Sequence, residues 1–370
     1  MYCEADLVRI AKRENNKKRA YVVANRLQGK HIPVSPDQAL FMFEALADIV
    51  QKSYGTHKLL VVGFAETATA IGAAVSVRLN AYYIQTTREQ IDGADYLYFS
   101  EEHSHATEQK LVKDDLDQVI SETDRVIFVE DEVTTGKTIL NIIRILEQAY
   151  PGQVSYAAAS ILNGMDEEAL RIYREKGIDL HYLVKTDHAD YAKTAGQYTK
   201  KGGYVNCVKD REMVRNADTF KEYKVSGWMD ARRLVSAADY QQACMQLWDK
   251  TDSLLHEAFK GRVLVLGTEE FMYPALWAAS QIAHCGCEVR FHATTRSPIE
   301  VYEEDGYPLH ARYELLSLYD KNRRTFIYDL AAYDAVLIMT DAHGEEREGI
   351  DSLVQAAAQF SRNIFMIRWC

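Results

Sequence analysis

The stretch Arg125-Val-Ile-Phe-Val-Glu-Asp-Glu-Val-Thr-Thr-Gly-Lys-Thr138 joins a short apolar run to two acids and a turn rich in threonine. The β-branched and aromatic residues Val126–Val129 predict a buried strand, and Ile139–Tyr150 beyond the turn predicts a helix. Ligands of open α/β sheets bind beyond the carboxyl ends of such strands. The acids and the turn are therefore expected to lie at a binding site.

The turn Thr134-Thr-Gly-Lys-Thr138 has the chemistry of an anion cradle. It offers backbone N–H groups at a helix N-terminus, a glycine for close approach and threonine hydroxyls as donors. A Walker P-loop would need glycine at the position of Asp131, so that interpretation is excluded. Because Glu130 and Asp131 directly precede the cradle, the pattern suits a ligand with hydroxyls next to a phosphate, such as a ribose 5-phosphate.

Two segments alternate strand-like and helix-like runs, which predicts an α/β fold with mostly parallel sheets. The expected strands of the first segment are Leu59–Val62, Ala81–Gln85, Tyr96–Phe99, Val126–Val129, Val154–Leu162 and His181–Val184. Those of the second are Val263–Leu266, Glu288–Ala293, Thr325–Tyr328, Ala335–Met339 and Asn363–Ile367. The predicted organisation is an N-terminal hood or extension (1–35), a first domain (36–184), a linker or site-covering segment (185–229) and a second domain (230–370).

The two segments also resemble each other in their polar residues. Leu59–Glu66 is similar to Val263–Glu270, and both runs continue into alanine-rich helices. Thr86-Thr-Arg88 is repeated as Thr294-Thr-Arg296. We therefore expect an internal duplication.

Composition limits the function classes. A chain of 370 residues suggests about two domains. The formal charge of −11 disfavours a general nucleic-acid binder, although residues 1–30 are locally basic and Lys30-His31 is expected to reach the site from the hood. We expect no membrane segment or export signal, and a cytoplasmic location, because no long apolar stretch is present. The six scattered cysteines are typical of reduced thiols.

An apolar strand, two acids, two further residues and Thr-Thr-Gly-x-Thr resemble the phosphoribosyl pyrophosphate (PRPP) signature of type I phosphoribosyltransferases. Glu130 stands where aspartate is commoner. Gly63–Ala70, Glu101–Ala106 and Thr294–Pro298 resemble the two-domain branch found with tellurium-resistance gene clusters. In that branch an orotate-phosphoribosyltransferase-like domain precedes a TRSP domain. The resemblance implies a Rossmann-like parallel sheet with a hood, followed by a degenerate α/β copy.

The resemblance also implies site residues. The ribose hydroxyls would be bound by Glu130 and Asp131. The 5-phosphate would be bound by Thr134, Thr135, Gly136, Lys137 and Thr138. The pyrophosphate would be bound by Ala65, Glu66, Thr67, Ala68 and Thr69, with Arg88 as a nearby cation.

A mobile loop over Glu101–Ala106 is implied to close over the site. Glu102, His103 and His105 are candidates for exchanging a proton with the incoming base, since the pKa of histidine suits that task. A solvated loop and a zinc site are alternatives for the same residues. Mg²⁺ is expected to be held mainly by PRPP, with Glu130 and Asp131 as further ligands.

The second copy lacks the Thr-Thr-Gly-x-Thr loop after Thr340-Asp341, so we do not expect it to bind PRPP in the same way. Its candidate site comprises Glu269, Glu270, Thr294, Thr295, Arg296 and Ser297. A structural or dimerisation role for this domain is the alternative. Glu66 and Glu270 are also compatible with simple helix capping.

The expected function is a Mg²⁺-dependent phosphoribosyltransferase that joins PRPP to a nitrogenous base and releases pyrophosphate, or runs the reverse. The resemblance places it in a specialised nucleotide-like or tellurium-resistance pathway. A non-catalytic PRPP or nucleotide sensor is the alternative, and the C-terminal domain could carry chemistry of its own. The expected partners are these small molecules, a second copy in a homodimer and products of the same gene cluster, with no nucleic acid and no membrane.

Overall fold

The computed structural model describes residues 2–14, 19–99, 109–208, 220–344 and 347–370. Contacts divide the chain into two compact units that do not follow the linear order of the sequence. Unit 1 comprises Met1–Glu4, Leu40–Asp187 and Met229–Gln242, and unit 2 comprises Ala5–Ala39, His188–Trp228 and Ala243–Cys370. Two of the divisions fall inside long helices, α2 (Pro36–Tyr54) and α8 (Ala237–Leu255).

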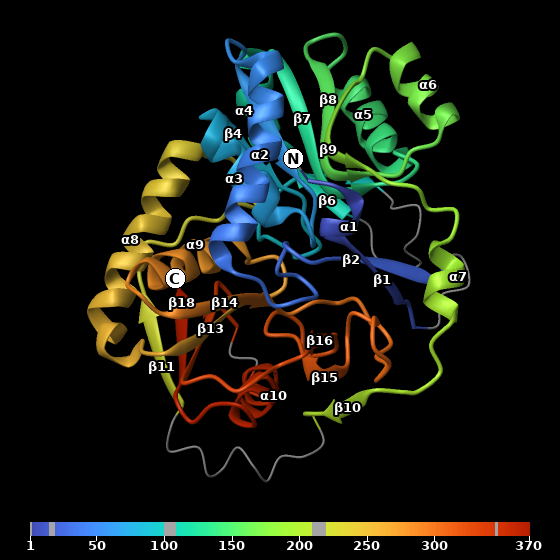
Figure 1. The fold of residues 1–370 in the computed structure, drawn as a ribbon. Helices are drawn as coiled ribbons and strands as arrows, with labels where there is room; N and C mark the ends of the chain where they lie inside the picture. The colour runs from blue at the N-terminus through green and yellow to red at the C-terminus, as the bar shows by residue number, and fades with distance from the viewer. Residues whose placement is uncertain (1, 15–18, 100–108, 209–219, 345–346) are drawn as a thin grey trace. The chain divides into compact units, whose positions relative to one another are not determined.

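Unit 1 is built on a sheet with the strand order β12-β4-β3-β7-β8-β9. Its strands are β3 (Leu59–Gly63), β4 (Tyr82–Gln85), β7 (Arg125–Val133), β8 (Ser155–Asn163), β9 (Asp179–Lys185) and β12 (Val235–Ser236). All neighbours are parallel except β12, which runs antiparallel to β4. Figure 1 shows β7, β8 and β9 side by side.

The central strands of unit 1 form because both faces of the sheet are buried. Every residue of β3 is buried, as is the apolar part of β7 from Val126 to Val129. Such continuous apolar runs are typical of parallel strands covered on both sides. The helices of this unit are α3 (Thr69–Leu79), α4 (Lys113–Val119), α5 (Lys137–Ala149) and α6 (Glu167–Glu175), with the 3-10 turn η1 (Ile120–Glu122) and the antiparallel pair β5 (Tyr96–Phe99) and β6 (Gln109–Val112).

Unit 2 contains a parallel sheet with the order β11-β18-β17-β13-β14. These strands are β11 (Phe220–Val225), β13 (Arg262–Gly267), β14 (Glu288–Ala293), β17 (Ala335–Thr340) and β18 (Ile364–Trp369). The helices are α9 (Tyr273–His284) and α10 (Arg347–Ala358), with the 3-10 turn η3 (His256–Ala258). Side chains of β13, β17 and α10 form one core, with Leu264, Ile338 and Leu353 almost fully buried.

The N-terminal segment, residues 5–39, packs in unit 2 and not in the first α/β unit. After α1 (Glu4–Leu7), β1 (Val8–Lys12) pairs antiparallel with β2 (Tyr21–Asn25). The Lys12 N–H donates to the Tyr307 hydroxyl at 2.8 Å, and Glu14 pairs with Arg312 at 2.6 Å. Ala11 and Val22 share a core with residues near Ile299. Residues 5–35 of the expected hood therefore belong to unit 2, and the role of residues 1–35 as a hood stays a prediction.

The stretch 185–229, expected to be a linker or site-covering segment, contributes regular elements to unit 2. It contains α7 (Tyr191–Gly196), β10 (Gly203–Asn206) and β11. β10 joins a three-stranded sheet with β15 (Ala311–Leu316) and β16 (Arg324–Tyr328), and β11 pairs with β18. These strands are stabilised by partners far along the chain, which local sequence patterns do not reveal.

The expected internal repeat is seen in the topology. The order β4-β3-β7-β8-β9 of unit 1 corresponds to β14-β13-β17-β18-β11 of unit 2. Equivalent backbone hydrogen bonds run from Thr86 N to Gly63 O at 2.9 Å and from Thr294 N to Gly267 O at 3.0 Å. The predicted α/β class with parallel sheets in both copies is confirmed. One difference concerns the place of the outermost strand in the sequence. In unit 1 this strand, β9, comes after the other parallel strands of its sheet, whereas in unit 2 the equivalent strand, β11, comes before them.

His292 predicts a pH dependence of the stability of unit 2. Its ring is fully buried, and Nδ1 and Nε2 each lie 3.1 Å from a carbonyl oxygen, that of Gly29 and that of Tyr328 respectively, while Ala293 N lies 2.9 Å from Nδ1. Burial, with a smaller contribution from Lys30, lowers the pKa of His292 to about 4. The unfolded chain binds this proton below about pH 6.5 and the folded chain does not. The free energy of unfolding should therefore fall by about 1.4 kcal/mol per pH unit between those values.

Urea unfolding of the wild type and of His292→Asn at pH 7, 6 and 5 checks this prediction. Carboxylates also titrate in part of this range, so the informative quantity is the difference between the two proteins. The variant should show the shallower decline as the pH falls. Parallel pH profiles would contradict the assignment.

Candidate functional site

The loop after β3 is fixed by the end of β4. Ala65 N donates to Thr86 Oγ1 at 2.8 Å, and the Gln109 side chain hydrogen-bonds both Thr86 Oγ1 and Ala65 O. The peptide bond between Ala65 and Glu66 is cis. Ala65, Glu66, Ala68 and Thr69 are buried, and Thr67 is half-buried. The residues expected to bind pyrophosphate therefore form one ordered loop that leads into α3.

The two acids lie within β7, before its end at Val133. Asp131 Oδ1 accepts hydrogen bonds from Thr67 Oγ1 at 2.9 Å and from Glu132 N at 3.0 Å. Burial, and to a smaller extent the charge of Glu130, raises the pKa of the Tyr173 hydroxyl above its usual range. Asp131 thus connects β7 to the loop after β3, and Glu130 faces the side of Tyr173.

The turn after β7 leads directly into α5, as the sequence predicts. Gly136 is the N-terminal cap of α5, with a left-handed φ of 70°, and its carbonyl accepts from Tyr173 Oη at 2.7 Å. Lys137 N donates to Thr135 Oγ1 at 3.3 Å. Thr134, Thr135 and Thr138 are half-buried, and Lys137 is exposed. The first N–H groups of a helix lack intrahelical partners, so this turn is suited to bind an anion.

Gly136→Ala is expected to destabilise unit 1 and to weaken binding of an anion at this turn. A Cβ here would lie 2.3 Å from Met165 Cε and 2.4 Å from Tyr173 Oη. Overpacking of this kind costs about 1–3 kcal/mol, and the left-handed backbone adds about 1–2 kcal/mol. Denaturant unfolding measures the loss. Gly152→Ala is the matched control, because Gly152 has a similar φ of 66° with nothing within 4 Å of its added Cβ. Equal losses in the two variants would show that the close packing around Gly136 is unimportant.

The end of β4 carries the expected basic residue. Thr87 exchanges two backbone hydrogen bonds with Lys110 of β6, and Thr87 Oγ1 accepts from Glu89 N at 2.9 Å. Arg88 lies between these anchored residues and is half-buried. The candidate proton-transfer residues Glu102, His103 and His105 lie outside the described residues, and their roles stay predictions.

The carboxylates of unit 1 fit a magnesium ion that is held mainly by its ligand. Mg²⁺ usually keeps several waters and binds to one or two carboxylates and to substrate phosphates. Glu130 and Asp131 would supply those carboxylates beside the anion-binding turn. Among the residues that the structure describes, no group of three or more His, Cys, Asp or Glu side chains is arranged to hold a metal ion.

In unit 2 the loop after β13 shares one hydrogen bond with the loop after β3, although Glu269 has a left-handed φ of 49°. Glu269 N donates to Thr294 Oγ1 at 3.0 Å, as Ala65 N does to Thr86 Oγ1. Thr295 exchanges backbone hydrogen bonds with Phe326, as Thr87 does with Lys110. Ser297 N then donates to Thr295 Oγ1 at 3.2 Å. The Thr-Thr-Arg repeat in the sequence therefore corresponds to the same local structure in both units.

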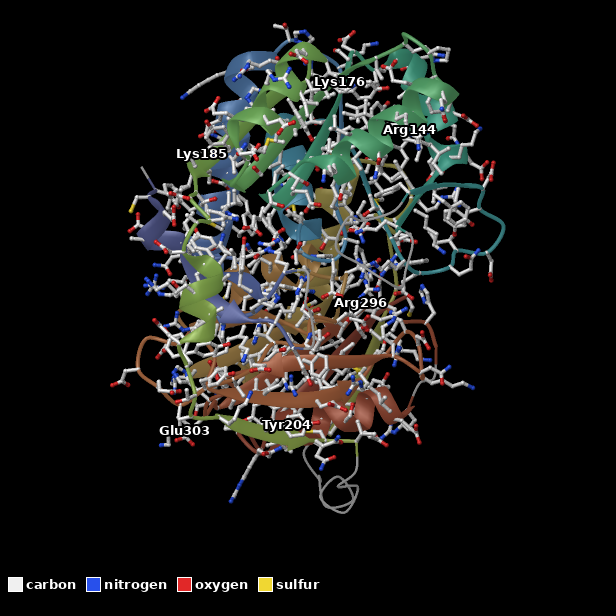
Figure 2. All side chains as sticks on the ribbon, turned by 90° about the vertical axis from the view of Figure 1, so that its right-hand side faces the viewer. Arg144, Lys176, Lys185, Tyr204, Arg296 and Glu303 are labelled. Atoms are coloured by element: carbon white, nitrogen blue, oxygen red, sulfur yellow. The ribbon has the colours of Figure 1, made fainter. Side chains whose placement is uncertain are left out.

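The candidate residues of unit 2 form a buried network of charges. Arg296, labelled in Figure 2, donates to Glu270 Oε1 at 2.9 Å. Glu269 accepts from Arg323 at 2.9 Å and from Ser317 at 2.5 Å, and Arg296 Nε lies 3.7 Å from it. The structure thus brings Glu269, Glu270 and Arg296 together with two residues that the sequence did not single out. Both acids form ion pairs, which goes beyond the simple helix capping that the sequence also allowed.

The loop after β17 differs from the turn after β7 of unit 1. The carbonyl oxygens of Ala342 and Gly344 accept hydrogen bonds from the Arg368 guanidinium, which also pairs with Glu222 at 2.8 Å. Arg368 is on β18 and is buried. Because carbonyls of this loop face a cation, it does not present the N–H cradle expected for phosphate. This agrees with the loss of the Thr-Thr-Gly-x-Thr pattern.

Sequence patterns missed several residues that shape the two sites. Thr86 and Gln109 hold the loop of unit 1, and Ser317 and Arg323 contact Glu269. Lys30 was expected at the first site, but it is fully buried in unit 2. The repeated Thr-Thr-Arg run could have identified Thr86. The other contacts come from distant segments without a sequence signal.

Comparisons with known families match both parts of the chain. Residues 7–187 match the family model described as "Phosphoribosyl transferase". Residues 231–357 match the model described as "TRSP domain C terminus to PRTase_2". A comparison with curated proteins gave no match. None of the described helices is long and apolar enough to cross a membrane.

Several solved structures resemble about half of the chain. Adenine phosphoribosyltransferase from Rhodothermus marinus has 16% identity and a TM-score of 0.36, over 49% of this chain and 96% of that chain. The Giardia lamblia enzyme has 18% identity and a TM-score of 0.37, over 51% and 100%. Orotate phosphoribosyltransferase from Aeropyrum pernix has 16% identity and a TM-score of 0.32, over 49% and 89%. Because these TM-scores are low, the three structures provide no evidence on the fold beyond the strand order described above.

Proposed function

Because the chain belongs to the family in which a phosphoribosyl transferase domain precedes a TRSP domain, we propose that unit 1 transfers a phosphoribosyl group between PRPP and a nitrogenous base. Pyrophosphate would be released in the forward direction and consumed in the reverse. The proposal concerns the ligand and the reaction within this family, and unit 1 carries the groups that such a transfer needs.

The observation that supports the proposal best is the hydrogen bond between Thr67 and Asp131. It joins the loop after β3 to the acid end of β7, where the anion-binding turn at Gly136 begins α5. A ligand with a phosphate, two hydroxyls and a pyrophosphate can be met by the turn, the acids and the loop respectively. Ligands of parallel α/β sheets bind at these carboxyl ends, where adjacent connections diverge.

The residues would act mainly by positioning and charge. Breaking the bond between the ribose C1 and pyrophosphate builds positive charge on the sugar and negative charge on the leaving group. Glu130 and Asp131 would accept bonds from the ribose hydroxyls, and Arg88 would stabilise the leaving pyrophosphate. Mg²⁺ bound with PRPP would supply further positive charge to the pyrophosphate oxygens. The backbone N–H groups at the start of α5 would keep the 5-phosphate in place.

Calorimetric titration of PRPP with Mg²⁺ into the full chain tests the binding step. Release of pyrophosphate is then measured over a panel of purine and pyrimidine bases. We expect saturable binding of PRPP and base-dependent release of pyrophosphate. Binding without turnover for any base would indicate a PRPP-binding regulator, and no binding of PRPP would overturn the proposal.

A further inference from the structure

In each unit, a short segment from the other half of the chain pairs antiparallel with the outermost parallel strand of the sheet. In unit 1, Val235 and Ser236 of β12 pair with Tyr83 and Tyr82 of β4. In unit 2, Val34 exchanges backbone hydrogen bonds with Phe291 of β14 at 2.8 and 2.9 Å. β4 and β14 are equivalent strands in the repeat. The two bordering segments therefore occupy equivalent places.

The bordering segments are themselves copies of each other. Val34-Ser35 precedes α2, and Val235-Ser236 precedes α8, and each helix has 19 residues. Most of α2 belongs to unit 1, whereas Val34 and Ser35 belong to unit 2. For α8 the assignment is reversed, because Val235 belongs to unit 1 and Ala243–Leu255 belongs to unit 2. The two copies have thus exchanged the segment before their first helix.

In unit 2 the exchanged segment reaches the loop after β13. Lys30 Nζ donates to Glu269 O at 2.8 Å and to Thr294 O at 2.9 Å. Glu269 and Thr294 are the equivalents of Ala65 and Thr86 in unit 1, because the same hydrogen bond joins each pair. The segment before the first helix therefore contacts this loop directly.

In unit 1 the same place is taken by residues 229–236, which we call the Arg232 segment. Ala231 O accepts from Gln85 N at 2.8 Å, one residue before Thr86. Arg233 forms two hydrogen bonds of 2.7 Å with Asp115, and Leu234 N donates to the same carboxylate at 2.8 Å. The residues on both sides of Arg232 are thus fixed to unit 1.

Arg232 is the buried cation of this segment. Its side chain is 7% exposed, and Nη1 lies 3.1 Å from Asp230 Oδ1. It follows directly after Ala231, which is bonded at the end of β4, and Thr86 and Arg88 lie on the same connection. A positive charge in such a weakly solvated position attracts an anion more strongly than a charge in water.

We infer that the exchanged Arg232 segment completes the phosphoribosyl transferase site of unit 1 and that Arg232 binds an anionic group of its ligand there. The nature of that ligand rests on the proposed function, and pyrophosphate is the group expected next to the loop after β3. The N-terminal segment, by contrast, supplies Lys30 to unit 2. Each site is thus completed by residues from the opposite half of the chain.

Disulfide trapping tests the exchange without reference to any activity. Directly opposed residues of antiparallel strands have Cα atoms about 4.5–5.5 Å apart, which a disulfide can span. Ser236→Cys with Tyr82→Cys should form a disulfide in the full chain, after the exposed Cys3, Cys285 and Cys370 are replaced by serine. Ser35→Cys with Tyr82→Cys is the matched control, and it should not. The reverse result, read by peptide mass mapping without reductant, would overturn the exchange.

Titration of inorganic pyrophosphate with Mg²⁺ tests the role of Arg232. Arg232→Ala should raise the dissociation constant by about tenfold or more, since a hydrogen bond to a charged group contributes about 1.5–3 kcal/mol. Arg232→Lys should restore part of the affinity. Arg233→Ala is the control for a loosened segment, and it should lower the melting temperature with less effect on the dissociation constant.

The outcomes separate this inference from the proposed function. A wild type that binds neither PRPP nor pyrophosphate would overturn the proposed function and the role of Arg232, while the disulfide pattern would still decide the exchange. A wild type that binds both, together with an Arg232→Ala variant of equal affinity, would overturn only the role of Arg232. Equal losses of affinity in Arg232→Ala and Arg233→Ala would show that the segment acts as a whole and that Arg232 does not contact the ligand.

Discussion

The double variant Glu130→Ala/Asp131→Ala is expected to lose measurable PRPP binding and to lower turnover by about a thousandfold or more. Both carboxylates would accept hydrogen bonds from the ribose hydroxyls, and each bond to a charged group contributes about 1.5–3 kcal/mol. The variant also removes the acceptor of the Thr67 hydroxyl, so the loop after β3 loses its connection to β7. Calorimetry with PRPP and Mg²⁺ and an assay of pyrophosphate release measure the two effects.

A matched control removes the same charge from the same unit. Glu167 and Glu168 are exposed in the first turn of α6, so Glu167→Ala/Glu168→Ala should bind PRPP like the wild type. Thermal unfolding of both double variants checks that unit 1 remains folded. A folded Glu130→Ala/Asp131→Ala protein with unchanged affinity would show that the acids of β7 do not hold the ribose.

The parts of the fold that the sequence predicted are those determined by local patterns. The apolar run Val126–Val129 forms the centre of β7, and α5 begins directly after Gly136. The repeat was visible because Gly63 and Glu66 recur as Gly267 and Glu270. In such places the same residues determine both the strand and the loop after it, so a short stretch of sequence is sufficient.

The parts that were not predicted depend on partners far along the chain. β11 forms because it pairs with β18, and β12 has only two residues beside β4. Nothing in Val235-Ser236 alone marks it as a strand. In the same way Gln109 became part of the candidate site only because its strand lies next to the Ala65 loop. Pattern and propensity describe neighbours in sequence, whereas these contacts are determined by the topology.

The second unit shares a hydrogen bond of one loop with the first unit but lacks the Thr-Thr-Gly-x-Thr turn. The loop after β13 has a hydrogen bond to Thr294 that is equivalent to the hydrogen bond of the first loop to Thr86. On β18, however, Arg368 donates to carbonyls of the loop after β17. A phosphate bound there would have to compete with Glu222 for the same guanidinium. Arg368 therefore joins the loop after β17 to Glu222 in an internal network.

Glu269→Ala is expected to lower the free energy of unfolding of the second unit by about 3–5 kcal/mol. The Glu269 side chain is 2% exposed and pairs with Arg323 at 2.9 Å, with Arg296 Nε at 3.7 Å. Ser317 also donates to it. Removing this carboxylate leaves Arg296 with Glu270 and Arg323 with only the partly exposed Asp320 at 3.7 Å, and a desolvated charge that loses its nearest partner is costly. Denaturant unfolding followed by circular dichroism measures the loss.

The control for this variant is an ion pair at the surface of the same unit. Glu288 lies 3.4 Å from Arg262, and both side chains are about half exposed. Solvent screens such a pair, so Glu288→Ala should cost about 0–1 kcal/mol. If Glu269→Ala cost as little, the Glu269 network would not be needed for folding, and its acids and arginines would be better explained as groups held ready for a ligand. A large loss of stability would instead show that the Glu269 network stabilises the second unit.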